Sequence, residues 1–372
     1  MADRFRIAFF GSSLVSAYWN CTAMYYRGLI RALHQRGHRV TFYEPDAYDR
    51  QKHRDLDDPP WARVVVYPTD HAEGVRRCLD EARHADVIIK ASRVGVFDEL
   101  LEEAVVSLKR PTNLVIYWDV DAPATLGRIH RNPADPLASL IRRYDLILTY
   151  SGGDPVVHAY QSLGARCCVP IYNALDPTTH FPVVPDDRFK GDLAFLGNRL
   201  PDREARVEAF FFETARRMPR RRFVLGGSGW ADKPLPPNVH YVGHVYTRDH
   251  NAFNCTPLAV LNVNRQSMAR YGFSPPTRIF EAAGAGACLI TDAWRGIELF
   301  LEPGREVLVA HDVQQVAQHL MSLTPIEARR IGQAALHRVL SEHTYAHRVA
   351  QLEQLLEARA PRHTLPQNIP SA

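Results

Sequence analysis

Long apolar runs and patterned cysteines are what this sequence lacks. None of its 372 residues lie in a stretch that approaches the ~20 consecutive apolar residues of a membrane span. The start, "MADRFRIAFFGSS", holds an apolar run too short for the core of a signal peptide. The six cysteines, at 21, 78, 167, 168, 255 and 288, form no CxxC motif and no metal-like pairing with histidine. We therefore expect reduced thiols and a cytoplasmic protein.

An excess of charge of one sign is also missing. Lys+Arg total 45 against Asp+Glu 41, and the resulting net charge of +4 is too small to predict a nucleic-acid partner. One basic cluster, "RRMPRRRF" at 216–223, suits either the C-terminal end of a helix or a contact with an anionic membrane surface. Peripheral membrane association therefore stays open.

Two successive runs of strand-helix alternation are what the sequence does contain. Strands are predicted in the first half at "RIAFFG", "RVTFYE", "ARVVVYP", "ADVIIKAS", "TNLVIYWD", "YDLILTYS" and "ARCCVPIYNA". After "FPVVPDDRFKG", which has the prolines and charges of a linker, the alternation resumes with "DLAFLGN", "RFVLGGSG", "VHYVGHV", "LAVLNVN", "ACLITDA" and "EVLVAHD". The pattern predicts an α/β protein with two Rossmann-like domains.

The domain boundaries follow from the same pattern. We predict an N-terminal Rossmann-like domain at 1–181, a linker at 182–190, a C-terminal Rossmann-like domain at 191–340, a helix at 341–358 that packs back toward the N-terminal domain, and a tail at 359–372. Neither opening strand is followed by GxGxxG, since "GSSLVS" and "GNRLPD" lack the later glycines. This disfavours a nicotinamide-dependent oxidoreductase.

The segment "GFSPPTRIFEAAGAG", residues 272–286, carries the clearest functional signal. Ser274 is predicted as the N-cap of a helix and Pro275 as its first residue. Arg278 and Glu281 lie three apart on one helical face, where they form either an intrahelical salt bridge or a cation and an acceptor for a ligand. A helix N-terminus beside a guanidinium favours a phosphate.

These residues resemble a known family. "GFSPPTRIFEAAGAGACLITDAWRGIELFLEPGREVLVAHD", with "LNVNRQSMARYGFSPPTR", "VGHV", "GGSGW" and "LAFLGNRLPDRE" upstream, is similar to the donor-binding half of CgeB-like (spore maturation protein B) bacterial glycosyltransferases. "YWDVDAP", "YDLILTYSGG" and "IYNALDPTTHFP" extend the resemblance into the first half. It implies the GT-B fold, in which two Rossmann-like domains, one for the acceptor and one for the nucleotide-sugar donor, face each other across a cleft.

The resemblance also implies a donor site in the C-terminal half. Glu281 would hold the ribose hydroxyls, while Arg278 and the backbone of Ser274, Pro276 and Thr277 would face the diphosphate. The remaining implied donor-binding residues follow three strands: Gly197, Asn198 and Arg199; Gly227 and Ser228; and His244, Val245 and Tyr246. For Arg199, His244 and the glycine-rich loop, a purely structural role is the alternative. Many retaining GT-B enzymes carry a further glutamate eight positions before the ribose glutamate, but Phe273 stands there, so the stereochemistry of that larger group does not carry over.

The N-terminal half is expected to supply the acceptor site and a base. Asp119 and Asp121 follow a predicted strand, and either is a candidate general base, with Asp119 preferred; a turn or capping role is the alternative. The candidate acceptor-binding residues, which stand after the first strand or near the hinge, are Ser12, Ser13, Tyr18, Trp19 and Asn173. Core packing is the alternative for the two aromatic side chains. We expect no metal, although Asp-x-Asp occurs in metal-dependent glycosyltransferases of another architecture.

Together these observations predict a metal-independent glycosyltransferase that moves a sugar from a nucleoside diphosphate donor, UDP first and dTDP second, to an unidentified acceptor. Arg278 would act in catalysis by stabilising the leaving diphosphate. Two alternatives stay open: a nucleotide-sugar epimerase of the same double Rossmann-like architecture, and a non-catalytic sugar-nucleotide binding protein.

Overall fold

The computed structural model describes residues 4–18, 20 and 22–359, and the chain divides into two compact units. Unit 1 comprises 1–150, 156–171 and 349–372, and unit 2 comprises 151–155 and 172–348. The expectations for Trp19, Cys21 and the tail from 360 onward lie outside the described residues. Within the described part of the chain, no helix combines the length and apolar character needed to cross a membrane.

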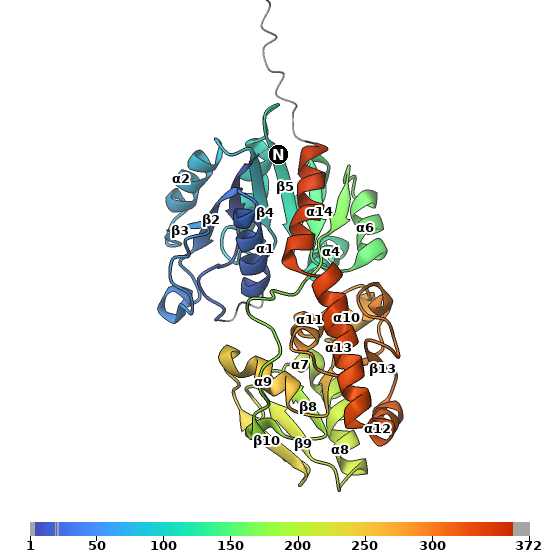
Figure 1. Ribbon diagram of the computed structural model, residues 1–372. Helices are drawn as coiled ribbons and strands as arrows, with labels where there is room; N and C mark the ends of the chain where they lie inside the picture. The colour runs from blue at the N-terminus through green and yellow to red at the C-terminus, as the bar shows by residue number, and fades with distance from the viewer. Residues whose placement is uncertain (1–3, 19, 21, 360–372) are drawn as a thin grey trace, which may run out of the picture. The chain divides into compact units, whose positions relative to one another are not determined.

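Unit 1 is built on a parallel sheet with the strand order β3-β2-β1-β4-β5-β6-β7. Its strands are β1 Arg6–Phe10, β2 Arg39–Pro45, β3 Arg63–Tyr67, β4 Val87–Ala91, β5 Leu114–Asp119, β6 Leu146–Thr149 and β7 Cys168–Pro170. Its helices are α1 Ala23–Gln35, α2 Glu73–Ala82, α3 Asp98–Ser107, α4 Ala122–Arg131, α5 Pro136–Leu140 and most of α6 Gly153–Ser162 (Figure 1). The seven predicted strands are all present.

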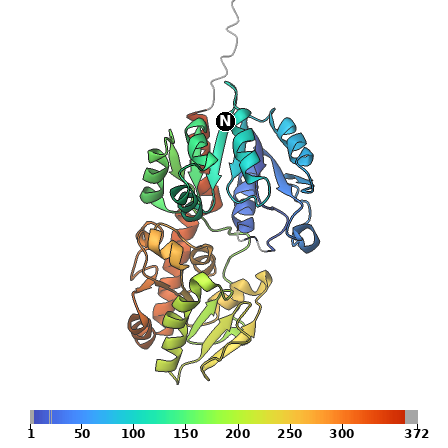
Figure 2. The ribbon, with the colours of Figure 1, turned by 180° about the vertical axis from the view of Figure 1, so that it is seen from behind.

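Unit 2 repeats this design. Its parallel sheet has the order β10-β9-β8-β11-β12-β13, with β8 Leu193–Leu196, β9 Phe223–Gly226, β10 Val239–Gly243, β11 Ala259–Asn262, β12 Leu289–Asp292 and β13 Leu308–Ala310. Its helices are α7 Pro201–Val207, which continues through a π-helical turn into α8 Glu213–Arg217, then α9 His250–Cys255, α10 Gln266–Tyr271, α11 Thr277–Gly284, α12 Val313–Ser322 and α13 Pro325–Glu342 (Figure 2). All six predicted strands are present, and both sheets have the strand order of a Rossmann fold.

The core of unit 2 shows why its strands are short continuous apolar runs. In β8, Leu193 and Phe195 join one cluster of buried side chains, while Ala194 and Leu196 join a second cluster. Successive side chains of a strand point to opposite faces, so helices cover both faces and both must be apolar.

The chain returns to unit 1 at its C-terminal end. Helix α14, Tyr345–Glu357, belongs to unit 1 from residue 349 onward. Its buried Glu353 accepts hydrogen bonds from Arg36 Nε at 2.5 Å and pairs with the buried His38 Nε2 at 2.8 Å. Contacts of this kind anchor the last helix to the first βαβ segment.

The predicted start of the helix at 272–286 was wrong by two residues. Helix α11 begins at Thr277, and Pro276 is its N-cap with an extended backbone at φ −68° and ψ 149°. Pro275 precedes another proline, and a residue in that position avoids helical dihedral angles. The side chain of Ser274, predicted as the cap, is buried and donates instead to the carbonyl oxygen of Gly272 at 2.8 Å.

The basic cluster at 216–223 pairs with acidic side chains. Arg216 and Arg217, in the last turn of α8, bind Glu208 and Glu213, and Arg221 binds Asp192 at 2.7 Å. Each of these ion pairs lies within unit 2. The arginines therefore stabilise local structure.

Candidate functional site

The candidate site lies at the carboxyl ends of the unit 2 strands. Strands β8 and β11 are neighbours in the sheet, although β9 and β10 separate them in sequence. The crossover connections on the two sides of this pair therefore run in opposite directions, and open α/β sheets bind ligands beyond the strand ends at such a point.

Backbone hydrogen bonds join the loops that follow β8, β9 and β10. Gly197 N–H donates to the Gly226 carbonyl at 2.9 Å and Gly227 N–H donates to the Gly243 carbonyl at 2.8 Å. Gly227 has φ +118°, and a Cβ there would lie 2.3 Å from the Gly197 carbonyl oxygen. A glycine is thus required because two loops approach each other closely.

Side chains tie the same loops together. Asn198 Oδ1 accepts the Ser228 N–H at 3.0 Å, and Arg199 N–H donates to the Ser228 carbonyl at 2.9 Å. His244 Nδ1 lies 3.4 Å from Ser228 Oγ. The structure therefore brings together the three segments that the sequence analysis assigned to the donor.

The guanidinium of Arg199 is already paired. It contacts Glu204 at 2.8 Å and Asp232 at 3.1 Å, and the hydrogen bond to Glu204 is the main reason that the pKa of Arg199 is raised. To contact a phosphate, Arg199 would have to exchange these carboxylates for the ligand. Its predicted role is thus less direct than that of Arg278, whose Nη1 is buried without a hydrogen-bond partner among the described residues.

Arg278 is free of such carboxylates. Among the described residues it makes no ion pair with Glu281, so the intrahelical salt bridge is not formed. Its Nη1 is buried without a hydrogen-bond partner. Burial, partly opposed by the charge of Glu281, lowers the pKa of Arg278. A buried guanidinium with an unused donor is well suited to receive an anion.

Arg203, in the first turn of α7, is a site residue that the sequence analysis missed. Burial and the charges of Arg278 and Arg265 lower its pKa to about 10, so three guanidinium groups affect one another at this position. Arg203 Nη2 donates to the Asn198 carbonyl at 2.6 Å, and its Nε is buried without a partner. The only sequence signal was a second arginine four residues after Arg199 in "GNRLPDRE". Such a concentration of cations favours a di-anionic ligand such as a diphosphate.

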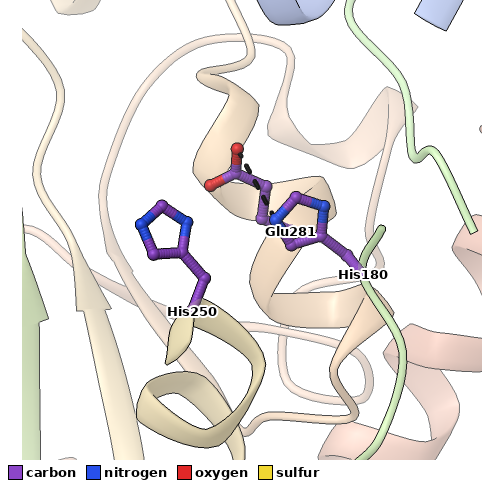
Figure 3. Close-up of side chains that lie close together, drawn as sticks. All are labelled: His180, His250 and Glu281. Carbon is purple, nitrogen blue, oxygen red and sulfur yellow. Dashed lines mark ion pairs between the residues drawn. The ribbon is translucent and has the colours of Figure 1, made fainter. Parts of the chain in front are cut away.

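Glu281, on α11, lies between two histidines that the sequence analysis also missed. Figure 3 shows the rings of His180 and His250 on either side of its carboxylate, and one ligand atom of each residue lies within 4.8 Å of the others. Burial would raise the pKa of Glu281, but His180, Arg278 and His250 together outweigh burial and hold it below its usual value. The carboxylate is therefore ionised at neutral pH and can accept hydroxyl protons. No local pattern marks the two histidines, because His180 lies in a loop and His250 begins helix α9, about 70 residues later.

Other predicted donor-side residues have different surroundings. Pro276 and Thr277 form the start of α11, where N–H groups near the helix end lack helical acceptors. Val245 is buried, whereas Tyr246 is 61% exposed and its ring meets that of His244 edge-on at 4.7 Å. Val245, Tyr246 and His244 also line a surface cavity of about 450 Å³ along β10.

Asn173, predicted as an acceptor-binding residue, lies in the irregular segment after β7 and contacts the turn before α11. It lies in unit 2, and its fully buried side chain donates to the Pro275 carbonyl at 3.3 Å. Its Oδ1 is buried without a partner. The side chain supports the turn that precedes α11.

The two candidate bases in unit 1 differ sharply in exposure. Asp119 is fully buried, and its carboxylate accepts hydrogen bonds from Ser92, Thr125, Tyr160 and the Asp121 N–H at 2.5–3.0 Å. Burial raises the pKa of Asp119 despite these donors. Such a group cannot approach a substrate hydroxyl, which argues against the preferred candidate. Asp121 is partly exposed and pairs with the exposed Arg93.

The serines predicted to bind an acceptor point into unit 1. Ser12 Oγ donates to Asn20 Oδ1 at 3.0 Å and Ser13 Oγ donates to Glu44 Oε1 at 2.8 Å, and both serines are buried. These hydrogen bonds fix the loop after β1 and leave the hydroxyl groups occupied. Tyr18 is 40% exposed and stacks on His53 with a centroid distance of 4.1 Å. Tyr18 is thus the described member of this set that is open to a sugar ring.

Comparisons with known proteins bear on this geometry. Residues 203–354 match a protein-family model described as glycosyl transferase-like. No curated protein matches the chain significantly. Among solved structures, sucrose-phosphate synthase from Thermosynechococcus elongatus shares 14% identity and a TM-score of 0.68 over 95% of this chain and 99% of that one. HepE from Anabaena in complex with UDP-glucose shares 14% identity and a TM-score of 0.66 over 95% and 100%.

The fold is GT-B. The fold is also similar to that of an α-glucosyltransferase in complex with UDP and a 13-mer DNA, with 11% identity and a TM-score of 0.66 over 95% of this chain and 100% of that one. In this GT-B chain, the family match includes Arg203, His250, Arg278 and Glu281, whereas His180 precedes it. The family match and the GT-B fold together support a glycosyltransferase.

Proposed function

We propose that this protein transfers a sugar from a nucleoside diphosphate sugar, UDP first and dTDP second, to an acceptor, with no metal required for donor binding. The observation that carries the proposal is the convergence at α11 of Arg278, whose buried Nη1 has no hydrogen-bond partner among the described residues, with an ionised carboxylate, Glu281. The first matches the diphosphate and the second matches the vicinal hydroxyls of the ribose.

The leaving group determines the chemistry that this site must supply. When the bond between the sugar and the diphosphate breaks, negative charge grows on the diphosphate oxygens. Arg278, Arg203 and the N–H groups at the start of α11 are fixed donors that stabilise this charge without reorganising. The buried surroundings strengthen each interaction relative to water.

The neighbouring proteins support this donor class. Three structures of HepE contain a ligand of this class: one holds UDP-glucose, one holds UDP, and one holds both UDP and glucose. The α-glucosyltransferase is described with UDP. We also propose that the protein is a CgeB-like enzyme and that it acts in the cytoplasm. For the base we now favour Asp121 over Asp119, because only the former is open to solvent.

Calorimetric titration tests the proposal. UDP, dTDP, GDP and ADP are titrated into the protein in EDTA and again with magnesium. We expect micromolar binding of one nucleotide in EDTA, and at least tenfold weaker binding (~1.4 kcal/mol) in Glu281→Ala. Glu298→Ala is the matched control, because Glu298 is an exposed glutamate of the same unit. No binding of any nucleotide to the folded wild-type protein would overturn the proposal.

A second measurement separates transfer from the alternatives. The protein is incubated with the sugar derivative of the bound nucleotide, and the products are analysed by mass spectrometry. Release of the nucleoside diphosphate indicates transfer or hydrolysis. An isomer of unchanged mass would indicate an epimerase, and binding with no product under any acceptor would indicate a binding protein.

A further inference from the structure

The cluster of His180, His250 and Glu281 has a feature that ribose binding does not explain. His180 Nε2 is buried, has no hydrogen-bond partner and lies 4.0 Å from Glu281 Oε1. A buried polar nitrogen is normally satisfied, so an unsatisfied one that faces a carboxylate needs a physical reason.

Thr179 holds the ring of His180 in place. Thr179 Oγ1 lies 3.1 Å from the Asp176 carbonyl and 2.9 Å from His180 Nδ1. The tautomer of His180 that donates from Nδ1 to Thr179 has its lone pair on Nε2, the nitrogen that faces Glu281, and this is the tautomer that binds a metal.

His250 is arranged in the same way. Its Nε2 lies 3.2 Å from the Val245 carbonyl, which can only accept, so Nε2 carries the proton. Nδ1 then remains with a free lone pair, and Figure 3 shows a ring nitrogen of His250 turned toward the Glu281 carboxylate. Hydrogen bonds to the second nitrogen orient metal-binding histidines in just this manner.

The backbone around the cluster holds these groups in place. Asn251, which follows His250 on α9, donates from Nδ2 to the Thr179 carbonyl at 3.0 Å, so the two histidine-bearing segments are joined. Gly284 on α11 allows the loop before His180 to approach, since a Cβ there would lie 3.1 Å from the His180 carbonyl oxygen. The site is therefore built from three elements of unit 2.

Two imidazole nitrogens and a carboxylate oxygen lie within 4.8 Å of one another, so a single cation can bind all three. Two imidazoles and one carboxylate form a borderline donor set that suits zinc, whereas magnesium and calcium prefer oxygen ligands. Zinc bonds of about 2.1 Å in a tetrahedral site place two ligand atoms about 3.4 Å apart. The 4.0 Å between His180 Nε2 and Glu281 Oε1 is close to this spacing and needs only a small side-chain shift.

We propose that His180, His250 and Glu281 form a zinc-binding site, and that zinc and the donor ribose compete for Glu281. The competition rests on the proposed function, whereas the metal site does not. In this proposal zinc is an inhibitor: it binds the Glu281 carboxylate that would otherwise bind the ribose hydroxyls, and it takes no part in sugar transfer. Three protein ligands leave a fourth position for water.

Calorimetry with zinc chloride on EDTA-treated, dialysed protein tests the metal site. We expect one zinc ion per chain with micromolar or tighter affinity, and at least tenfold weaker binding in His180→Ala and in His250→Ala. The matched control, His311→Ala, removes an exposed histidine of unit 2 and should bind zinc as the wild type does. His180→Asn, which keeps a polar side chain of similar reach, serves if the alanine variant does not fold.

Cobalt absorption and UDP titration complete the test. Cobalt(II) bound to the wild type should give the intense visible bands of four-coordinate geometry, and zinc should abolish them. UDP should bind at least tenfold more weakly to protein loaded with one equivalent of zinc, and His180→Ala should lose this sensitivity.

The outcomes separate the two proposals. Absence of zinc binding, or binding unchanged in both histidine variants, overturns the metal site even if UDP binds. Zinc binding at the cluster with UDP affinity unaffected keeps the metal site and overturns the competition. Zinc binding without any nucleotide binding overturns the proposed function and leaves the metal site standing.

Discussion

Gly227, the first residue after β9, offers a test of how closely the donor-side loops are packed. Its φ of +118° is unfavourable for an L-residue, and a Cβ would lie 2.3 Å from the Gly197 carbonyl oxygen, an atom of the backbone. Gly243, at the end of the adjacent β10, is the matched control. It also has a positive φ, +75°, but a Cβ there would meet nothing within 4 Å. Comparing alanine at the two positions isolates the steric contact between loops.

The magnitudes follow from these geometries. Gly243→Ala should cost about 1–2 kcal/mol of folding free energy, the strain of a left-handed conformation. Gly227→Ala carries backbone strain of the same order, about 1–2 kcal/mol, and in addition an overpacking cost of about 1–3 kcal/mol. The loss of unfolded-state entropy that accompanies Gly→Ala is the same in both and cancels. The crowded position should therefore be the more costly by about 1–3 kcal/mol.

Urea unfolding followed by tryptophan emission measures this difference. Trp230, fully buried in unit 2, donates from Nε1 to the Gly197 carbonyl at 2.7 Å, so it is the one of the five tryptophans whose contribution to the emission comes from the loop concerned. UDP affinity should also fall further in Gly227→Ala, because the 197–199 loop must move. Equal unfolding free energies for the two variants, within about 0.5 kcal/mol, would refute the argument that loop contact requires glycine.

Three further predictions concern charged groups. Arg203→Met should weaken UDP binding at least tenfold (~1.4 kcal/mol) yet leave stability unchanged or raised: the pKa of Arg203 is lowered to about 10, so its charge disfavours the folded state at neutral pH. A loss of stability in urea would contradict this. Arg206→Ala should cost about 3–5 kcal/mol at pH 7, because it leaves the buried Asp292, 2.5 Å from Arg206, as an unpaired charge. Burial already raises the pKa of Asp292, so the stability lost in Arg206→Ala should be smaller at lower pH, where Asp292 is protonated. Urea unfolding of the variant and the wild type at pH 5 and pH 7 measures this difference. An equal loss of stability at both pH values would count against the mechanism. Asp121→Asn should lower the rate of sugar transfer without affecting stability, whereas Asp119→Asn should chiefly lower the unfolding free energy, by about 1–3 kcal/mol; the reverse assignment would restore Asp119 as the base.

Much of the fold followed from local pattern. Each predicted strand of both sheets is present, because short apolar runs flanked by glycine, proline and helical periodicity are strong signals for parallel α/β structure. The start of α11 was misplaced since the analysis weighed Ser274 and Pro275 as caps without the effect of the second proline on the residue before it.

The candidate site was predicted unevenly. The segments after β8, β9 and β10 meet as expected, because parallel strands deliver their following loops to one edge of the sheet. The burial of Asp119 and Asn173 was not predicted, since position in sequence does not reveal whether a polar side chain turns toward solvent or into the protein. Both turned inward and found buried partners.

By itself the sequence determined the two parallel sheets and the helix that carries Arg278 and Glu281, because periodicity and glycine or proline placement depend on residues close along the chain. Only the tertiary structure decided what surrounds Glu281. His180, His250 and Arg203 come from separate loops and helices, and they meet because strand order folds distant connections onto one edge. Neither the burial of His180 Nε2 nor the mutual charge of the arginines has a local signature, since both arise from contacts across the fold.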